Sequence, residues 1–71
     1  MKFSPKIGML LIDGAKQCGK DPSAILMYIE EQLTFDEYAA IEEFLNWVVS
    51  TKRTTYGYNV ETVWNDWLQR K

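Results

Sequence analysis

Residues 35–51 read FDEYAAIEEFLNWVVST, and this stretch decides the fold. Its apolar side chains recur three and four residues apart, which is helical spacing. Placed at about 100° per residue, they cover an arc of roughly 200°, about twice the minimum apolar stripe of a surface helix. They are Tyr38, Ala40, Ile41, Phe44, Leu45, Trp47, Val48 and Val49. Such a helix needs neighbours on two sides, so we expect it to be central in the domain or to contact another chain.

Two capping signals precede this helix in the chain. Ser4-Pro5 and Asp21-Pro22 each place a capping side chain before a proline at the first helical position, where the missing N–H would have no partner. Gly19 suits the left-handed residue that ends a helix. We therefore expect one helix after Ser4 that ends near Gly19 and a second helix after Asp21.

The boundary between the second and third helices is set by a capping box. Thr34 and Glu37 have the spacing at which each side chain bonds the other's backbone N–H. This favours a break over a single bent helix across residues 22–51. Asn59 is expected to cap a fourth helix, and a strand at residues 6–13 stays an alternative because a short apolar run does not distinguish the two.

These signals predict an all-α bundle of three to four short helices forming a single domain over residues 1–71. Folding at this length buries only about 60% of the surface of the unfolded chain, so most large apolar side chains must be buried. One cysteine and no histidine leave no disulfide and none of the common zinc sites. The expected core comprises Leu10, Leu11, Ile25, Ile29, Ile41, Leu45, Val48, Val63, Trp64 and Trp67.

Charge is sorted along the chain. The net charge of −2 combines +3 in residues 1–20, −7 in residues 21–50 and +2 in residues 51–71. Two interpretations are open: a solvated face that the basic ends balance after folding, or a surface that attracts a basic partner. The second interpretation makes Glu30, Glu31, Asp36, Glu42 and Glu43 candidate partner-binding residues.

Three aromatic residues complete the candidate binding set. Trp47 lies one helical turn beyond Glu43, and a tryptophan beside carboxylates is a suitable hot spot for binding. Tyr56 and Tyr58 flank Gly57 in the one substantial loop and would add rigid contact area. The alternatives are that Trp47 packs inward and that both tyrosines close over the core.

Catalytic motifs are poorly represented. Gly14–Lys20 matches the spacing of a phosphate-binding loop, but Asp21 stands where a Ser or Thr hydroxyl should hold magnesium. Cys18 has no histidine base and falls on an apolar stripe, so we expect an inert thiol. The sequence thus predicts no enzyme, no cofactor and no metal site.

Nucleic-acid binding is the main alternative class. The third and fourth helices could form a helix-turn-helix whose flanking cations, Lys52, Arg53, Arg70 and Lys71, contact phosphates. The fourth helix, however, carries Glu61 and Asp66 on its polar face, where a helix that reads a groove needs Arg or Lys. The sequence therefore disfavours DNA binding and keeps a small DNA-binding regulator as the alternative function.

Two stretches carry a general resemblance to known proteins, FDEYAAIEEFLNW at residues 35–47 and VWNDWL at residues 63–68. With its short helices, the chain resembles over most of its length the small accessory proteins of tailed bacteriophages and prophages. The resemblance implies inhibition of a bacterial enzyme or defence complex by occlusion, sometimes with acids placed where nucleic acid would bind. It transfers no site residues.

Together these observations predict a small non-enzymatic protein-interaction module. Its expected partner is a protein with a basic surface, and the wide apolar arc also allows a homodimer. The apolar run at residues 7–12 is far too short to cross a bilayer. A single cysteine suits a reducing compartment, so we expect a cytoplasmic protein, in the host bacterium if it is phage-encoded.

Overall fold

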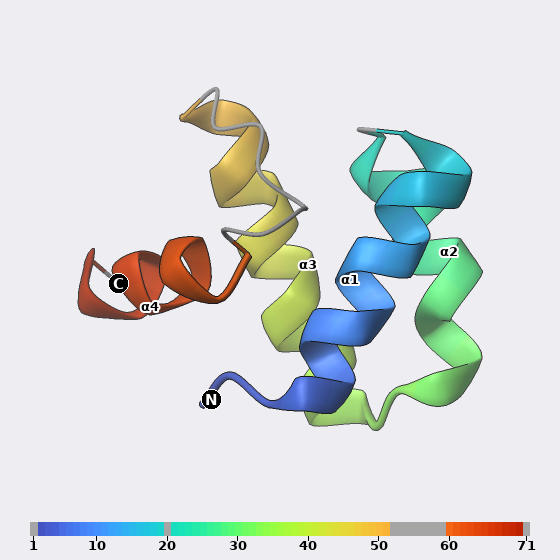
Figure 1. Ribbon diagram of the computed structural model, residues 1–71, viewed down its shortest axis with the longest axis horizontal. Coiled ribbons are helices and arrows are strands. Elements are labelled where there is room, and N and C mark those ends of the chain that lie inside the picture. Colours follow the sequence, from blue (N-terminus) through green and yellow to red (C-terminus); the bar gives the residue numbers. More distant parts are fainter. Residues whose placement is uncertain (1, 20, 52–59, 71) are drawn as a thin grey trace.

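The computed structural model describes residues 2–19, 21–51 and 60–70, and within these ranges the chain forms helices and no strand (Figure 1). The helices are α1 (Pro5–Cys18), α2 (Pro22–Ile29), α3 (Phe35–Ser50) and α4 (Val60–Arg70), with a short 3-10 turn, η1 (Glu30–Gln32), after α2. The all-α prediction is confirmed. The strand alternative at residues 6–13 is wrong, because α1 contains them. The predicted cap Asn59 lies outside the described residues.

Side chains cap the N-termini of the first two helices as the sequence predicts. The Ser4 hydroxyl accepts a hydrogen bond from the backbone N–H of Ile7 at 3.2 Å, and the Asp21 carboxylate accepts one from Ser23 at 3.0 Å. Gly19 ends α1 with φ of 71°, a backbone conformation that glycine adopts without steric penalty. Both proline caps are therefore confirmed.

The break before α3 is a complete capping box. The Glu37 N–H donates to the Thr34 hydroxyl at 3.2 Å, and the Thr34 N–H donates to a Glu37 carboxylate oxygen at 2.9 Å. Two donors that helix geometry leaves without partners are thus satisfied. Residues 22–51 form two helices joined by η1 and not one bent helix.

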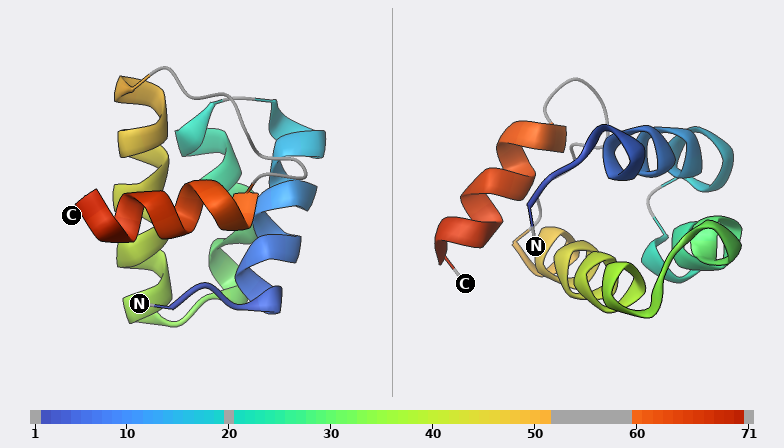
Figure 2. Two further views of the ribbon diagram at one scale, coloured as in Figure 1. Left: turned by 60° about the vertical axis from the view of Figure 1, so that its left-hand side comes forward. Right: turned by 90° about the horizontal axis from the view of Figure 1, so that it is seen from below.

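The four helices form a closed ring of packed pairs. α1 packs on α2, α2 on α3, α3 on α4 and α4 on α1, and α4 lies across α3 (Figures 1 and 2). The expectation that the third helix is central is wrong, since α3 has two main neighbours like the others. The reason is that its fully buried residues, Ile41, Phe44, Leu45 and Val48, cover an arc of only about 100°.

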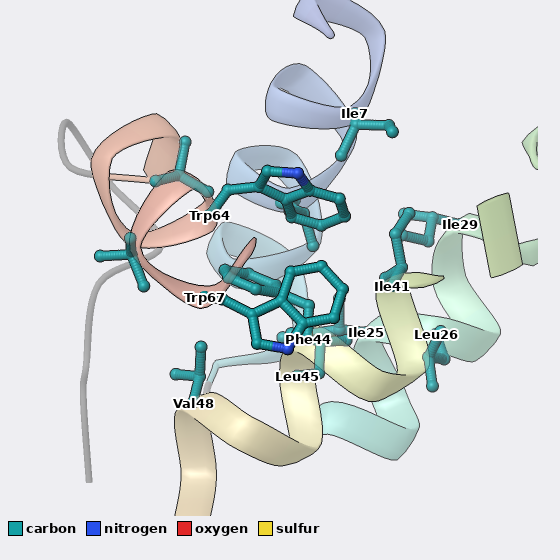
Figure 3. Close-up of a cluster of buried hydrophobic side chains, with 13 residues drawn as sticks. Ile7, Ile25, Leu26, Ile29, Ile41, Phe44, Leu45, Val48, Trp64 and Trp67 are labelled. Carbon is teal, nitrogen blue, oxygen red and sulfur yellow. The ribbon is translucent and has the colours of Figure 1, made fainter. Parts of the chain in front are cut away.

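Aromatic rings fill the part of the core between α3 and α4. Trp64 and Trp67 point from α4 toward Phe44 on α3 (Figure 3). The ring centroids lie 4.7 Å apart for Phe44 and Trp64 and 4.9 Å apart for the two tryptophans. Phe3 contacts Trp64 edge-on at 6.1 Å. These rings attach α4 to the rest of the bundle.

The predicted core is confirmed with one correction. Of the expected residues, only Leu10 is not buried; it packs on the core from its edge. Ile7, Leu26, Phe44 and Val60 are buried in addition. No polar or charged side chain among the described residues is buried, so the interior is held by apolar packing.

Gly14 allows α1 and α2 to approach closely. A Cβ atom at this position would lie 2.9 Å from Cγ2 of Ile25, which is fully buried. We expect Gly14→Val to lower the free energy of unfolding by about 1–3 kcal/mol, because the extra methyl groups overpack this contact. Urea denaturation would measure the change. Gln17→Val is the matched control on the exposed side of α1; an equal loss in both variants would contradict the close-packing explanation.

Candidate functional site

Five carboxylates on neighbouring elements form a surface that we call the acidic face. It comprises Glu30 and Glu31 on η1 and Asp36, Glu42 and Glu43 on α3, and all five are exposed. η1 leads almost directly into α3 at the lower end of the bundle in Figure 1, where Glu30, Glu31 and Asp36 are close in the chain, and Glu42 and Glu43 follow in the middle of α3. The five acids that the sequence selected are thus all exposed on two consecutive elements.

Among the described residues, few lysines or arginines form ion pairs with the acids of residues 21–50. Of the acids in residues 21–50, Glu37 forms an ion pair with Lys6 at 2.9 Å, and it faces α1. Glu30, Glu31, Asp36 and Glu42 form no ion pair with any lysine or arginine in the described ranges. The local field of the acidic face is consequently negative.

Helix dipoles separate these acids into two kinds. Asp36 lies in the first turn of α3, where the positive end of the dipole stabilises a carboxylate. Glu30 and Glu31 follow the C-terminus of α2, where the dipole is negative and the last turn has no basic residue. Glu42 lies mid-helix beside Glu43. Helix stability therefore explains why an acid is found at position 36, but it does not explain the acids Glu30, Glu31 and Glu42.

Trp47 lies at the edge of the acidic face and is half-buried. Its ring stacks on Phe44 with centroids 6.4 Å apart, and it packs against the core from outside. The side chain is thus used in packing and stays partly exposed. Its role in binding stays a prediction.

The structure describes some of the other predicted features, and the rest lie outside the described residues. Tyr56 and Tyr58 lie outside the described residues, as do Lys52 and Arg53. The glycine-rich motif does not form a phosphate-binding loop, because Gly14 is inside α1 and packs on Ile25. Cys18, at the end of α1, is partly buried and unbridged.

Exposed apolar side chains on α2 and α3 were not among the predicted site residues. Phe35 is 86% exposed, Met27 72% and Val49 49%. Phe35 could have been found by counting: at about 100° per residue it lies roughly 130° from the centre of the buried stripe of α3. It adjoins Asp36 on the acidic face.

Hydrogen bonds shift the pKa values of two titratable side chains outside the acidic face. The backbone N–H of Thr34 and then the Lys6 ammonium hold the pKa of Glu37 below its usual value. The Tyr28 hydroxyl donates to the Asp13 carboxylate at 3.1 Å, which raises the pKa of Tyr28. Both contacts join elements of the bundle.

The lowered pKa of Glu37 predicts how the stability of the fold depends on pH. Because the pKa is lower in the folded state, the ionised carboxylate adds stability above the unfolded pKa of about 4.3. That contribution is lost as the pH falls through the folded pKa. We expect the melting-temperature advantage of wild type over Glu37→Gln, which keeps the capping box, to shrink as the pH falls below the unfolded pKa and to vanish below the folded pKa. A constant advantage from pH 7 to pH 2 would contradict the ionic contribution.

A second surface feature lies between α1 and the start of α4. This open groove has a volume of about 290 Å³ and is lined by Phe3, Pro5, Gly8, Met9, Ile12, Val60 and Glu61. Its lining is apolar except for Glu61. In the described ranges, no three Asp, Glu or Cys side chains gather in a way that could hold a metal ion.

The structure and the comparisons add two further findings. Among the described residues, no helix combines the length and the apolar character needed to cross a bilayer. Comparison of the chain with protein-family models, with curated proteins and with solved structures found no match.

Proposed function

We propose that this protein is a non-enzymatic interaction module that binds a partner protein with a basic surface through its acidic face. The observation that carries the proposal is a set of exposed carboxylates that form no ion pair with a described residue, Glu30, Glu31, Asp36 and Glu42, together with the exposed ring of Phe35. In its finer form, the module acts in the cytoplasm as an inhibitor of the phage type, by occluding the partner's basic surface.

The charge distribution supports binding over simple solvation. Glu30 and Glu31 are unfavourable at the end of α2, and like charges along a helix destabilise it by a few tenths of a kcal/mol per pair. A basic partner offsets both effects and is also attracted over long range, which raises the association rate.

Salt-dependent capture tests this proposal. The tagged protein is incubated with a bacterial lysate at about 50 mM salt and washed in steps to about 500 mM, where charge interactions are screened over a few Å. We expect a small set of basic proteins to be retained at low salt and released during the steps. Retention of the same proteins at every salt concentration would contradict binding through the acidic face.

The DNA-binding alternative is tested separately by a gel shift with generic duplex DNA. On α4, Glu61 is exposed and Asp66 forms an ion pair with Arg70 at 3.0 Å, so this helix offers little positive charge to phosphates. We expect no retention of DNA at about 50 mM salt. Tight, salt-sensitive retention would favour the DNA-binding regulator and count against the protein-binding proposal.

A further inference from the structure

We propose that the partner presents a basic amphipathic helix that lies along the outward side of α3. This inference rests on the proposed function and names the kind of surface that the acidic face fits. The contact would be made by five exposed residues that we call the α3 seam: Phe35, Ala39, Glu42, Asn46 and Val49. Their spacing alternates between four and three residues, which is the pattern of the inner positions of a coiled coil.

The geometry of the seam suits a helix and not a single side chain. A spacing of 3.5 residues on average keeps the five side chains on one line toward a neighbouring helix, and the seam is about 21 Å long at 1.5 Å per residue. In the right-hand view of Figure 2, the described helices α1, α2 and α4 leave one side of α3 uncovered, and all five seam residues are exposed. The seam is therefore accessible along its length.

The ends of the seam are apolar. Phe35 is 86% exposed and Val49 49% exposed, so each leaves apolar area in water that a partner's apolar stripe would cover. Both lie on the same helix, four turns apart, with Ala39 between them. The exposed Met9 on α1 differs from these two residues, because it lines the groove between α1 and α4.

The charges of the seam define where the partner helix must carry positive charge. Glu42 lies at its centre, and Asp36 and Glu43 flank it on one side, seven residues apart. A helix packed along the seam must place a cation opposite Glu42 and further cations along that flank, as residues beside the apolar seam do in coiled coils. The partner helix is thus apolar at both ends of the contact and basic at its centre and edge.

A second copy of the chain does not meet this requirement. If two α3 helices packed antiparallel about their midpoint, Phe35 would meet Val49, but Glu42 would meet Glu42. A parallel arrangement would place every acid beside its equivalent. Like charges in direct contact disfavour both arrangements. The charge pattern therefore selects a basic helix from another protein.

The test uses a synthetic amphipathic peptide of about 21 residues as the probe, long enough to cover the seam in helical form. It carries leucine at the inner positions, lysine at the central inner position and lysine along both edges. A control peptide has glutamate in place of every lysine. Isothermal titration with the full-length protein gives the dissociation constants for the two peptides.

We expect the lysine peptide to bind and the glutamate peptide not to bind. Phe35→Ala and Glu42→Lys should each weaken binding about tenfold or more, as truncation or reversal of an anchor residue does. Met9→Ala removes another large exposed apolar side chain, from α1, and should change the affinity less than about twofold. Because Phe35 and Glu42 are exposed, circular dichroism should show an unchanged fold in both variants.

Two results would overturn the inference. If Phe35→Ala binds the peptide as wild type does, while charge reversal on the acidic face still releases the captured partner, the helix model fails and the proposed function stands. If sedimentation shows a dimer that Phe35→Ala dissociates, a second copy covers the seam. Failure of the proposed function has a different signature, in which charge reversal leaves partner capture unchanged.

Discussion

Trp64→Ala is expected to remove much of the stability of the fold. Trp64 is fully buried and contacts Phe3, Phe44 and Trp67, so its removal leaves a cavity where α4 meets α1 and α3. A large aromatic replaced by alanine costs about 3–5 kcal/mol. A chain of this length has only about 4–11 kcal/mol in total, at 0.05–0.15 kcal/mol per residue.

Thermal unfolding followed by circular dichroism measures this loss. At about 4–8 °C per kcal/mol for a domain of this size, the midpoint should fall by more than about 12 °C. Trp47→Ala is the matched control, because Trp47 is half-buried and contacts Phe44 from the edge of the core. We expect a clearly smaller fall for that variant. Equal falls would contradict the assignment of Trp64 to the centre of the aromatic cluster.

The double variant Asp36→Lys/Glu42→Lys is expected to abolish partner binding without unfolding the protein. Both side chains are exposed and form no ion pair with a described residue, so the fold does not depend on their charge. Against a basic partner, two reversed charges turn attraction into repulsion, which costs several kcal/mol. We expect the affinity to fall at least about 100-fold, and titration with the captured partner measures it.

A control variant separates the position of the charges from their number. Glu61→Lys/Gln17→Lys/Gln69→Lys raises the net charge by the same four units at exposed positions of α1 and α4. We expect it to reduce affinity only modestly, because long-range attraction falls but no contact is lost. If both variants lose binding to the same extent, net charge governs the interaction and the acidic face has no special role.

The helix boundaries and most of the core could be predicted from the sequence because local chemistry sets them. Ser4, Asp21 and Thr34 cap helices through bonds within three residues of themselves, so no tertiary contact is needed to foresee them. Periodicity likewise identified Ile41, Leu45 and Val48 as buried. What periodicity cannot supply is the identity of the neighbour, and α3 was therefore wrongly expected to be central.

The candidate site was predicted in part. A run of acids without a base implies an exposed surface, and all five carboxylates are exposed. Trp47 packs on the core with its ring stacked on Phe44, three residues before it in α3, which is one of the two alternatives that the sequence left open. Phe35 was overlooked although the expected core residues Ile41, Leu45 and Val48 already define the buried stripe, from whose centre Phe35 is turned by roughly 130°.

The central claim is that the acidic face contacts the partner, and amide chemical-shift mapping tests it most directly. The isotope-labelled protein is titrated with the captured basic partner or its binding fragment. We expect the shifted amides to be those of Glu30, Glu31, Asp36 and Glu42 and of their exposed neighbours on α3. Shifts confined to the groove between α1 and α4, around Met9 and Glu61, would contradict it.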